Sequence, residues 1–167
     1  MPALDSSWDR LLEKLARQPI QIAMVCTGGG SGAIANCFRR AGASRNFVDA
    51  AIPYSRAASE AYLGVVPADS RASLEFVQQL AAAALDRAVR LGQNDSSAPV
   101  GIALVAALPT EPPCDVEERI HVALHRAGDQ QCWSENLDKG MHSRESAETI
   151  ADQMMFQAIA YLVPGNG

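Results

Sequence analysis

A run of glycines sets the first structural unit of this chain. The apolar segment Ile20–Val25 precedes Cys26-Thr27-Gly28-Gly29-Gly30-Ser31-Gly32, and a helix-forming segment begins at Ala33. The pattern predicts a buried strand, a tight turn and a helix, because glycine adopts positive φ and lets a ligand or another backbone come close. Free N–H groups at the start of that helix would attract an anion.

The glycine spacing excludes two well-known phosphate loops. It differs from the Gly-x-Gly-x-x-Gly pattern of dinucleotide-binding folds, and no Lys-Ser or Lys-Thr pair follows it as in a P-loop. Three consecutive glycines exceed what a turn needs, and each destabilises the folded chain by entropy. A ligand-binding loop is therefore our preferred interpretation, and a plain strand-to-helix connection is the alternative.

Hydrophobic periodicity predicts helices and strands along the rest of the chain. Helices are expected at 6–15, 55–63, 70–91 and 143–162, each beginning at a serine cap. Further strands are expected at 47–54, 100–108, 119–126 and 130–136, the last two as a hairpin. This order predicts one α/β domain over residues 1–167, with a mixed, mostly parallel sheet between two helical layers, in three layers α/β/α.

Composition narrows the classes of partner. The net charge of −5 and a pI of about 5.1 argue against a nucleic acid or an anionic membrane surface. The charged, amphipathic N-terminal helix is unlike a secretory leader, and no apolar run is long enough to span a bilayer. The four cysteines fit no zinc or Cys-x-x-Cys spacing, so we expect no metal and no cofactor. Because the sequence shows no secretory leader, we expect a cytoplasmic protein with reduced thiols.

Two histidines stand four residues apart, at His121 and His125. On a helix this spacing would suggest metal ligands. The segment alternates like a strand, however, and the strand rise of ~3.3 Å per residue separates the two side chains by about 13 Å. We therefore expect no shared metal ion.

Three motifs resemble the CinA C-terminal domain family, the fold of bacterial nicotinamide-nucleotide amidohydrolases. Residues 26–29 resemble the end of its Ser-Cys-Thr-Gly-Gly element, and 42–47 resemble its Gly-Ser-Ser-x-x-Phe. Residues 54–65 resemble its Tyr-Ser-Asn-x-x-Lys-x-x-x-Leu-Gly-Val. The predicted order of helices and strands agrees across nearly the whole chain. The resemblance implies the family fold and a homo-oligomer, either a dimer or a trimer.

The same resemblance implies an activity and shows where this chain departs from it. The family hydrolyses the carboxamide of nicotinamide mononucleotide, with a serine nucleophile before Cys-Thr-Gly-Gly and a nearby tyrosine and lysine. Here Val25 occupies the serine position and Ser59 the lysine position. The family's Gly-Ile-Ala-Gly-Pro loop falls near 107–111, where the glycines are absent. We therefore predict a catalytically impaired relative.

The predicted site binds a small phosphorylated or anionic molecule, such as a pyridine nucleotide. Its candidate ligand-binding residues are Cys26, Thr27, Gly28, Gly29, Gly30, Ser31, Ser44, Tyr54, Ser55 and Arg56. Arg56 could pair bidentately with a phosphate. The candidates for a catalytic role are Tyr54 and Thr27.

Two other functions stay open at this point. The first is an active amidohydrolase with a rebuilt site that uses Thr27, Cys26 or a bound water. The second is a non-catalytic oligomerisation or regulatory module. In a divergent branch of the superfamily, such a domain precedes a nucleotidylyltransferase-like domain, which would be its partner.

Overall fold

Five strands form a single mixed sheet, in the order β2-β1-β3-β4-β5. The computed structural model describes residues 6–68 and 70–165, so the outermost residues of the predicted 1–167 domain lie outside the described part. The strands are β1 Ile20–Thr27, β2 Phe47–Ala51, β3 Ala98–Ala107, β4 Arg119–Arg126 and β5 Asp129–Asn136. β1 pairs in parallel with β2 and β3, and β4 pairs antiparallel with β3 and β5. Within the described chain, four strands point one way and β4 opposes them.

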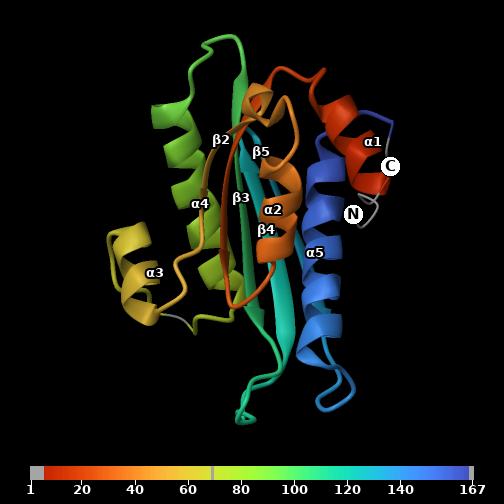
Figure 1. The fold of residues 1–167 in the computed structure, drawn as a ribbon. Helices are drawn as coiled ribbons and strands as arrows, with labels where there is room; N and C mark the ends of the chain where they lie inside the picture. The colour runs from red at the N-terminus through yellow and green to blue at the C-terminus, as the bar shows by residue number, and fades with distance from the viewer. Residues whose placement is uncertain (1–5, 69, 166–167) are drawn as a thin grey trace.

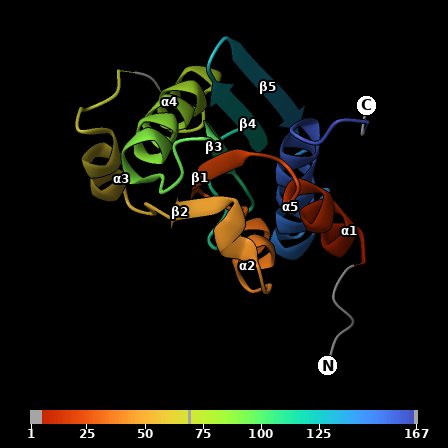
Figure 2. The ribbon, with the colours of Figure 1, turned by 90° about the horizontal axis from the view of Figure 1, so that it is seen from above.

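Helices cover both faces of the sheet, so the predicted three-layer architecture is confirmed (Figures 1 and 2). One face carries α1 Ser6–Leu15, α2 Ser31–Phe38 and α5 Arg144–Tyr161. The other face carries α3 Arg56–Leu63 and α4 Leu74–Leu91. No helix in the described ranges is long and apolar enough to cross a membrane.

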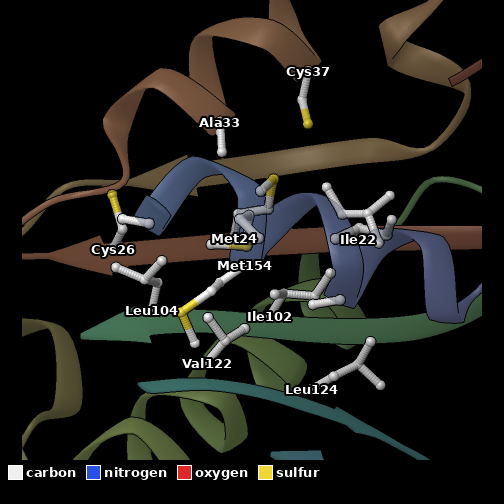
Figure 3. Close-up of a cluster of buried hydrophobic side chains, with 14 of the residues drawn as sticks. Ile22, Met24, Cys26, Ala33, Cys37, Ile102, Leu104, Val122, Leu124 and Met154 are labelled. Atoms are coloured by element: carbon white, nitrogen blue, oxygen red, sulfur yellow. The ribbon is translucent and has the colours of Figure 1, made fainter. Parts of the chain in front are cut away.

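The layer between the sheet and α2 and α5 is built from large apolar side chains. Alternate residues of a strand point to the same face. Fully buried side chains from three neighbouring strands meet residues of the two helices in this layer (Figure 3): Ile22, Met24, Ile102, Leu104, Val122 and Leu124. Burial of each such side chain stabilises the fold by roughly 1.5–3 kcal/mol.

In the opposite layer, small residues let α4 lie directly on the sheet at Gly101. A Cβ atom at Gly101 would stand only 2.3 Å from the Ala81 carbonyl oxygen and 2.3 Å from the Leu85 nitrogen. The alanine-rich face of α4 is buried against the equally small Ala103 and Ala123. Any side chain at position 101 would push the helix away from β3.

Serine caps set the helix starts, with one difference from prediction. Ser55 and Ser143 each accept a hydrogen bond from the backbone N–H three residues ahead, as capping requires. The start predicted at Ser70 is wrong, because Ser73 is the residue whose Oγ accepts the Phe76 N–H, at 3.1 Å. Ser70 instead forms a turn before α4, where its Oγ accepts the Ala72 N–H.

The two histidines lie on β4 as expected. The His121 Nδ1 atom lies 2.6 Å from the Ser134 Oγ atom. His125 pairs in register with Gly101, at the other end of the strand, and is buried. Burial lowers the pKa of both imidazoles.

Thiol accessibility tests this packing. Cys26 and Cys37 are buried, whereas Cys114 and Cys132 are exposed. Burial raises the pKa of each buried thiol to about 12. We expect two fast-reacting thiols in the native protein and four in guanidinium chloride, measured with a chromogenic disulfide reagent at pH 8. Replacing either exposed cysteine with serine should remove one fast thiol, and four fast native thiols would contradict the packing.

Candidate functional site

The glycine loop lies where the chain reverses its direction across the sheet. The β1–α2–β2 crossover covers one face, and the connection from β2 through α3 and α4 to β3 covers the other (Figure 2). Open α/β sheets bind ligands at such switch points, beyond the carboxyl ends of the strands. Thr27, at the end of β1, pairs with Val105 near the end of β3. The loop therefore starts in the expected place for a site.

Packing accounts for the glycines in this loop. Gly28 has a φ of 80°, and a Cβ there would stand 1.9 Å from the Ala106 carbonyl oxygen. A Cβ at Gly32 would stand 2.2 Å from the Asp152 carboxylate. Glycine at these two positions lets the loop lie against β3 and lets α2 lie against α5. The run of glycines thus has a structural cause that needs no ligand.

Two carboxylates of α5 occupy the N-terminus of α2. The Gly30 N–H donates to Glu148 Oε2 at 2.9 Å, and the Ala33 N–H donates to Asp152 Oδ1 at 3.0 Å. The first turn of a helix leaves N–H groups without partners and carries partial positive charge, so it attracts anions. Here the protein's own side chains stand where an external anion would bind. We call Glu148 and Asp152 the carboxylate pair.

Arg144 joins the carboxylate pair to the loop. Its Nη2 atom donates to Glu148 Oε1 at 2.9 Å and to the Gly28 carbonyl oxygen at 2.9 Å. Its Nη1 atom donates to the Pro109 carbonyl oxygen at 3.2 Å. One guanidinium therefore links α5, the glycine loop and the segment after β3. It also compensates the charge of Glu148.

The sequence predictions missed these three residues. Arg144, Glu148 and Asp152 recur every four residues, which places them on one face of the last helix. That spacing was the available signal. Nothing local indicates that this face packs on a loop more than a hundred residues earlier.

Electrostatics at the carboxylate pair disfavour chemistry by Cys26. Burial raises the pKa of Asp152 to about 6, with an opposing contribution from the Ala33 hydrogen bond. The Cys26 thiol is fully buried, and burial, followed by the charges of Glu148 and Asp152, raises its pKa to about 12. A nucleophilic cysteine must be a thiolate. Cys26 stays protonated at neutral pH.

Three predicted residues lie at the same edge of the sheet as the glycine loop. Tyr54, Ser55 and Arg56 follow β2, whose carboxyl end lies beside that of β1. Tyr54 is 72% exposed. Arg56 is exposed and has no ion pair among the described residues, whereas the Ser55 hydroxyl is used as a helix cap.

Ser44 lies elsewhere. It belongs to the short 3-10 helix η1, Ala43–Arg45, which precedes β2 at the amino edge of the sheet. Phe47 pairs with Ile22, so the five residue steps along β1 from Ile22 to Thr27 separate Ser44 from the glycine loop by ~16 Å. Ser44 is therefore not brought together with the other predicted residues.

The two positions that the sequence resemblance assigns to a nucleophile and a lysine hold Val25 and Ser59, and both residues are buried. Val25 is fully buried and belongs to the apolar cluster under α4, with Phe76 and Val105. Ser59 is buried on α3, and its Oγ donates to the Arg56 carbonyl oxygen at 2.8 Å. Thr27, the other hydroxyl at the strand end, is 8% exposed.

A cleft of about 520 Å³ opens between α3 and the segment that leads into α4. Arg71 lines it and is ion-paired with Glu60 at 2.5 Å. Arg56 lines it as well. The cleft therefore presents one guanidinium that is not used by an acidic side chain of the described chain.

Solved structures of low sequence identity share this architecture. A competence-damaged protein (CinA) superfamily member from Escherichia coli matches with a TM-score of 0.71 at 11% identity, over 96% of this chain and 90% of that chain. A Klebsiella pneumoniae member of that superfamily matches at 0.69 and 15% identity, over 92% and 93%. The competence/damage inducible protein CihA from Agrobacterium tumefaciens matches at 0.70 and 15%, over 95% and 94%. No protein-family model and no curated protein matches the sequence.

These matches confirm the predicted CinA-like fold over nearly the whole chain. The identities of 11–15% show a shared fold and carry no site residues across.

Replacing Asp152 tests the electrostatics of the carboxylate pair. The folded-state pKa of about 6 lies above the ordinary value of 3.8, so the carboxyl group favours folding at low pH and loses that contribution as pH rises through 6. Asp152→Asn keeps an acceptor for the Ala33 N–H and removes the charge. Because Asp152 is partly exposed, we expect the Asp152→Asn variant to be more stable than the wild type at pH 8 by only on the order of 1 kcal/mol.

The measurement is urea unfolding at pH 4 and pH 8. The difference between the two proteins should shrink as the pH falls from 8 to 4, because the folded-state carboxyl becomes neutral over that range. A variant that is less stable than the wild type at pH 8 would contradict the assignment.

Proposed function

From the CinA superfamily fold as premise, we propose that this chain is a catalytically impaired relative of the nicotinamide-nucleotide amidohydrolases, which binds a small anionic molecule without hydrolysing it. The observation that carries the proposal is the burial of Val25 in the apolar cluster under α4. The family resemblance puts the nucleophile at this position. We also propose a cytoplasmic location, which the four free thiols support.

The loss of chemistry follows from the side chains available. Acyl transfer needs an oxygen or sulfur nucleophile with an activating partner. Val25 offers neither, and the Ser59 hydroxyl is engaged with the backbone of its own helix. Removing such a group from an amidase lowers the rate by several orders of magnitude. The full burial of the Cys26 thiol and its raised pKa argue against a rebuilt active site that uses this residue.

The carboxylate pair disfavours binding of an anion at the glycine loop. Glu148 and Asp152 accept the N–H groups of α2 and would repel a phosphate at the glycine loop. Arg56, at the same edge of the sheet, is the better partner because no carboxylate of the described chain neutralises it. Tyr54, two residues earlier, exposes its ring. A pyridine mononucleotide offers both a ring to stack on Tyr54 and a phosphate for Arg56.

Calorimetry with nicotinamide mononucleotide tests both parts of the proposal. We expect a saturable heat that returns to baseline after each injection, and no release of ammonia. Arg56→Gln should weaken binding at least tenfold, which corresponds to about 1.4 kcal/mol. Arg90→Gln, an exposed arginine on α4, makes the same change in net charge and should leave affinity unaltered.

Continuing heat together with release of ammonia would show turnover and refute the proposal that the protein is catalytically impaired. Equal affinity in Arg56→Gln and the wild type would remove Arg56 from the ligand site.

A second candidate function, a self-associating module, has a separate observation in its favour. Large apolar side chains are exposed in several connections at the carboxyl edge of the sheet: Ile52, Tyr54, Val65, Val66, Val116 and Met141. Clusters of exposed apolar residues at one end of a domain are typical of contact surfaces between proteins. We propose that a dimer or trimer forms through this edge. A nucleotidylyltransferase-like partner would be the alternative occupant.

Light scattering on a sizing column tests the self-associating module. Val65→Ser combined with Val66→Ser should convert a dimer or trimer into a monomer, because both side chains are largely exposed at the proposed contact. The matched control is Val89→Ser, which removes an apolar side chain that is 61% exposed on α4. A monomeric wild type, or a double variant of unchanged mass, would contradict the proposal.

A further inference from the structure

A larger cleft lies at the amino edge of the sheet, away from the glycine loop. It measures about 710 Å³ and runs between α1 and the connection from α2 to β2. Its polar lining is rich in arginine, with Arg17 from the turn after α1 and Arg39, Arg40 and Arg45 from the connection. We call it the amino-edge cleft. None of the residues proposed above to bind a pyridine nucleotide lines it.

Three of these arginines form no ion pair in the part of the chain that the structure describes, although the Arg39 Nη2 atom donates a hydrogen bond to Asn36 Oδ1 at 2.5 Å. Arg17, Arg39 and Arg45 are exposed, and none of them has an ion pair within the described ranges. Arginines elsewhere in the chain do pair, as Arg87 does with Asp49 and Arg126 with Asp129. Three uncompensated guanidinium groups in one cleft are unexpected in a chain of net charge −5. The four arginines of the lining outnumber its two acidic side chains, Asp9 and Glu13, which favours an anionic ligand.

Arg40 has a different, structural role at the back of the cleft. Its side chain is 10% exposed, it forms an ion pair with Asp9 of α1, and its Nε donates to the Asn36 carbonyl oxygen at 3.0 Å. The pair ties α1 to the end of α2. It also neutralises Asp9, so Glu13 is the remaining acidic side chain in the lining.

Asn46 fixes the side of the cleft that the connection from α2 to β2 forms. This residue is buried, and its Nδ2 donates to the carbonyl oxygens of Gln18, at 3.3 Å, and Ile20, at 3.1 Å. Its own carbonyl oxygen accepts the Ile22 N–H at 2.6 Å. These bonds fasten the turn that carries Arg45 to the segment after α1 that follows Arg17. The cleft is therefore formed before any ligand arrives, which lowers the entropy cost of binding.

We propose that the amino-edge cleft binds a small molecule that carries a diphosphate or triphosphate group. Guanidinium groups present forked donors that match phosphate oxygens bidentately, and several of them together suit a chain of phosphates rather than one carboxylate. The volume lies within the 300–1,000 Å³ typical of small-molecule sites. Leu12, Ala16 and Phe47 supply an apolar wall for the rest of the ligand.

The diphosphate group could belong to a nucleotide or to inorganic pyrophosphate. Both share the chemistry that the arginines recognise, so calorimetry of the full chain uses ADP and pyrophosphate as separate probes, without magnesium and at low salt. We expect saturable binding of at least one probe. Affinity should fall as sodium chloride is raised, because the attraction between exposed charges is screened.

The discriminating variant is Arg39→Gln combined with Arg45→Gln. We expect it to weaken binding at least tenfold, while Arg90→Gln does not. Arg56→Gln should also leave this binding unchanged, which separates the amino-edge cleft from the site for a pyridine nucleotide. Because the substituted side chains are exposed, the thermal midpoint should stay close to that of the wild type. If the double variant melts early, Arg17→Gln alone serves in its place.

Each outcome decides the proposal. ADP bound more tightly than pyrophosphate supports a nucleotide ligand, and equal affinities support recognition of the diphosphate group itself. Binding of neither probe overturns the proposal, and so does undiminished affinity in the variants of the cleft.

Discussion

The contact between the last helix and the first helix after β1 organises one face of this molecule. Glu148 and Asp152 satisfy N–H groups of Gly30 and Ala33, and Arg144 fastens the same helix to the glycine loop. These bonds join segments about 118 residues apart in sequence. They bring α5 onto α2 and so enclose the apolar layer between them, which contains Cys26. The position of the loop, the protonation of that thiol and the packing of α5 all depend on this contact.

The same contact occupies the place where this fold would bind an anion, at the switch point of the sheet. A strand, a glycine turn and a helix together form an anion site only while the N–H groups of the helix stay available. In this protein internal carboxylates accept two of them, from Gly30 and Ala33, and the neighbouring Val25 is apolar and fully buried. The CinA-like fold is thus present, and our proposal is that amidohydrolase chemistry is absent from it. The cationic groups that remain available lie to either side, at Arg56 and in the amino-edge cleft.

Features that depend on neighbours in sequence were predictable. Serines such as Ser55 and Ser143 cap helices through backbone groups three residues away, so their positions can be inferred directly. The one misplaced cap, Ser70 for Ser73, arose because both serines precede the same apolar run and only the formed turn distinguishes them. The glycine loop was located correctly, but its glycines were assigned to a ligand because Ala106 and Asp152, which require them, are distant in sequence.

The amino-acid sequence by itself determined the order of helices and strands, the three-layer class and the absence of a serine at position 25. Each of these follows from periodicity, caps or the identity of one residue. The tertiary structure alone decided that the carboxylate pair fills the helix terminus, that Ser44 lies at the opposite edge from Gly28, and that three arginines converge on one cleft. Such groupings depend on which faces of distant elements pack together, and that choice is made by the whole core rather than by any local pattern.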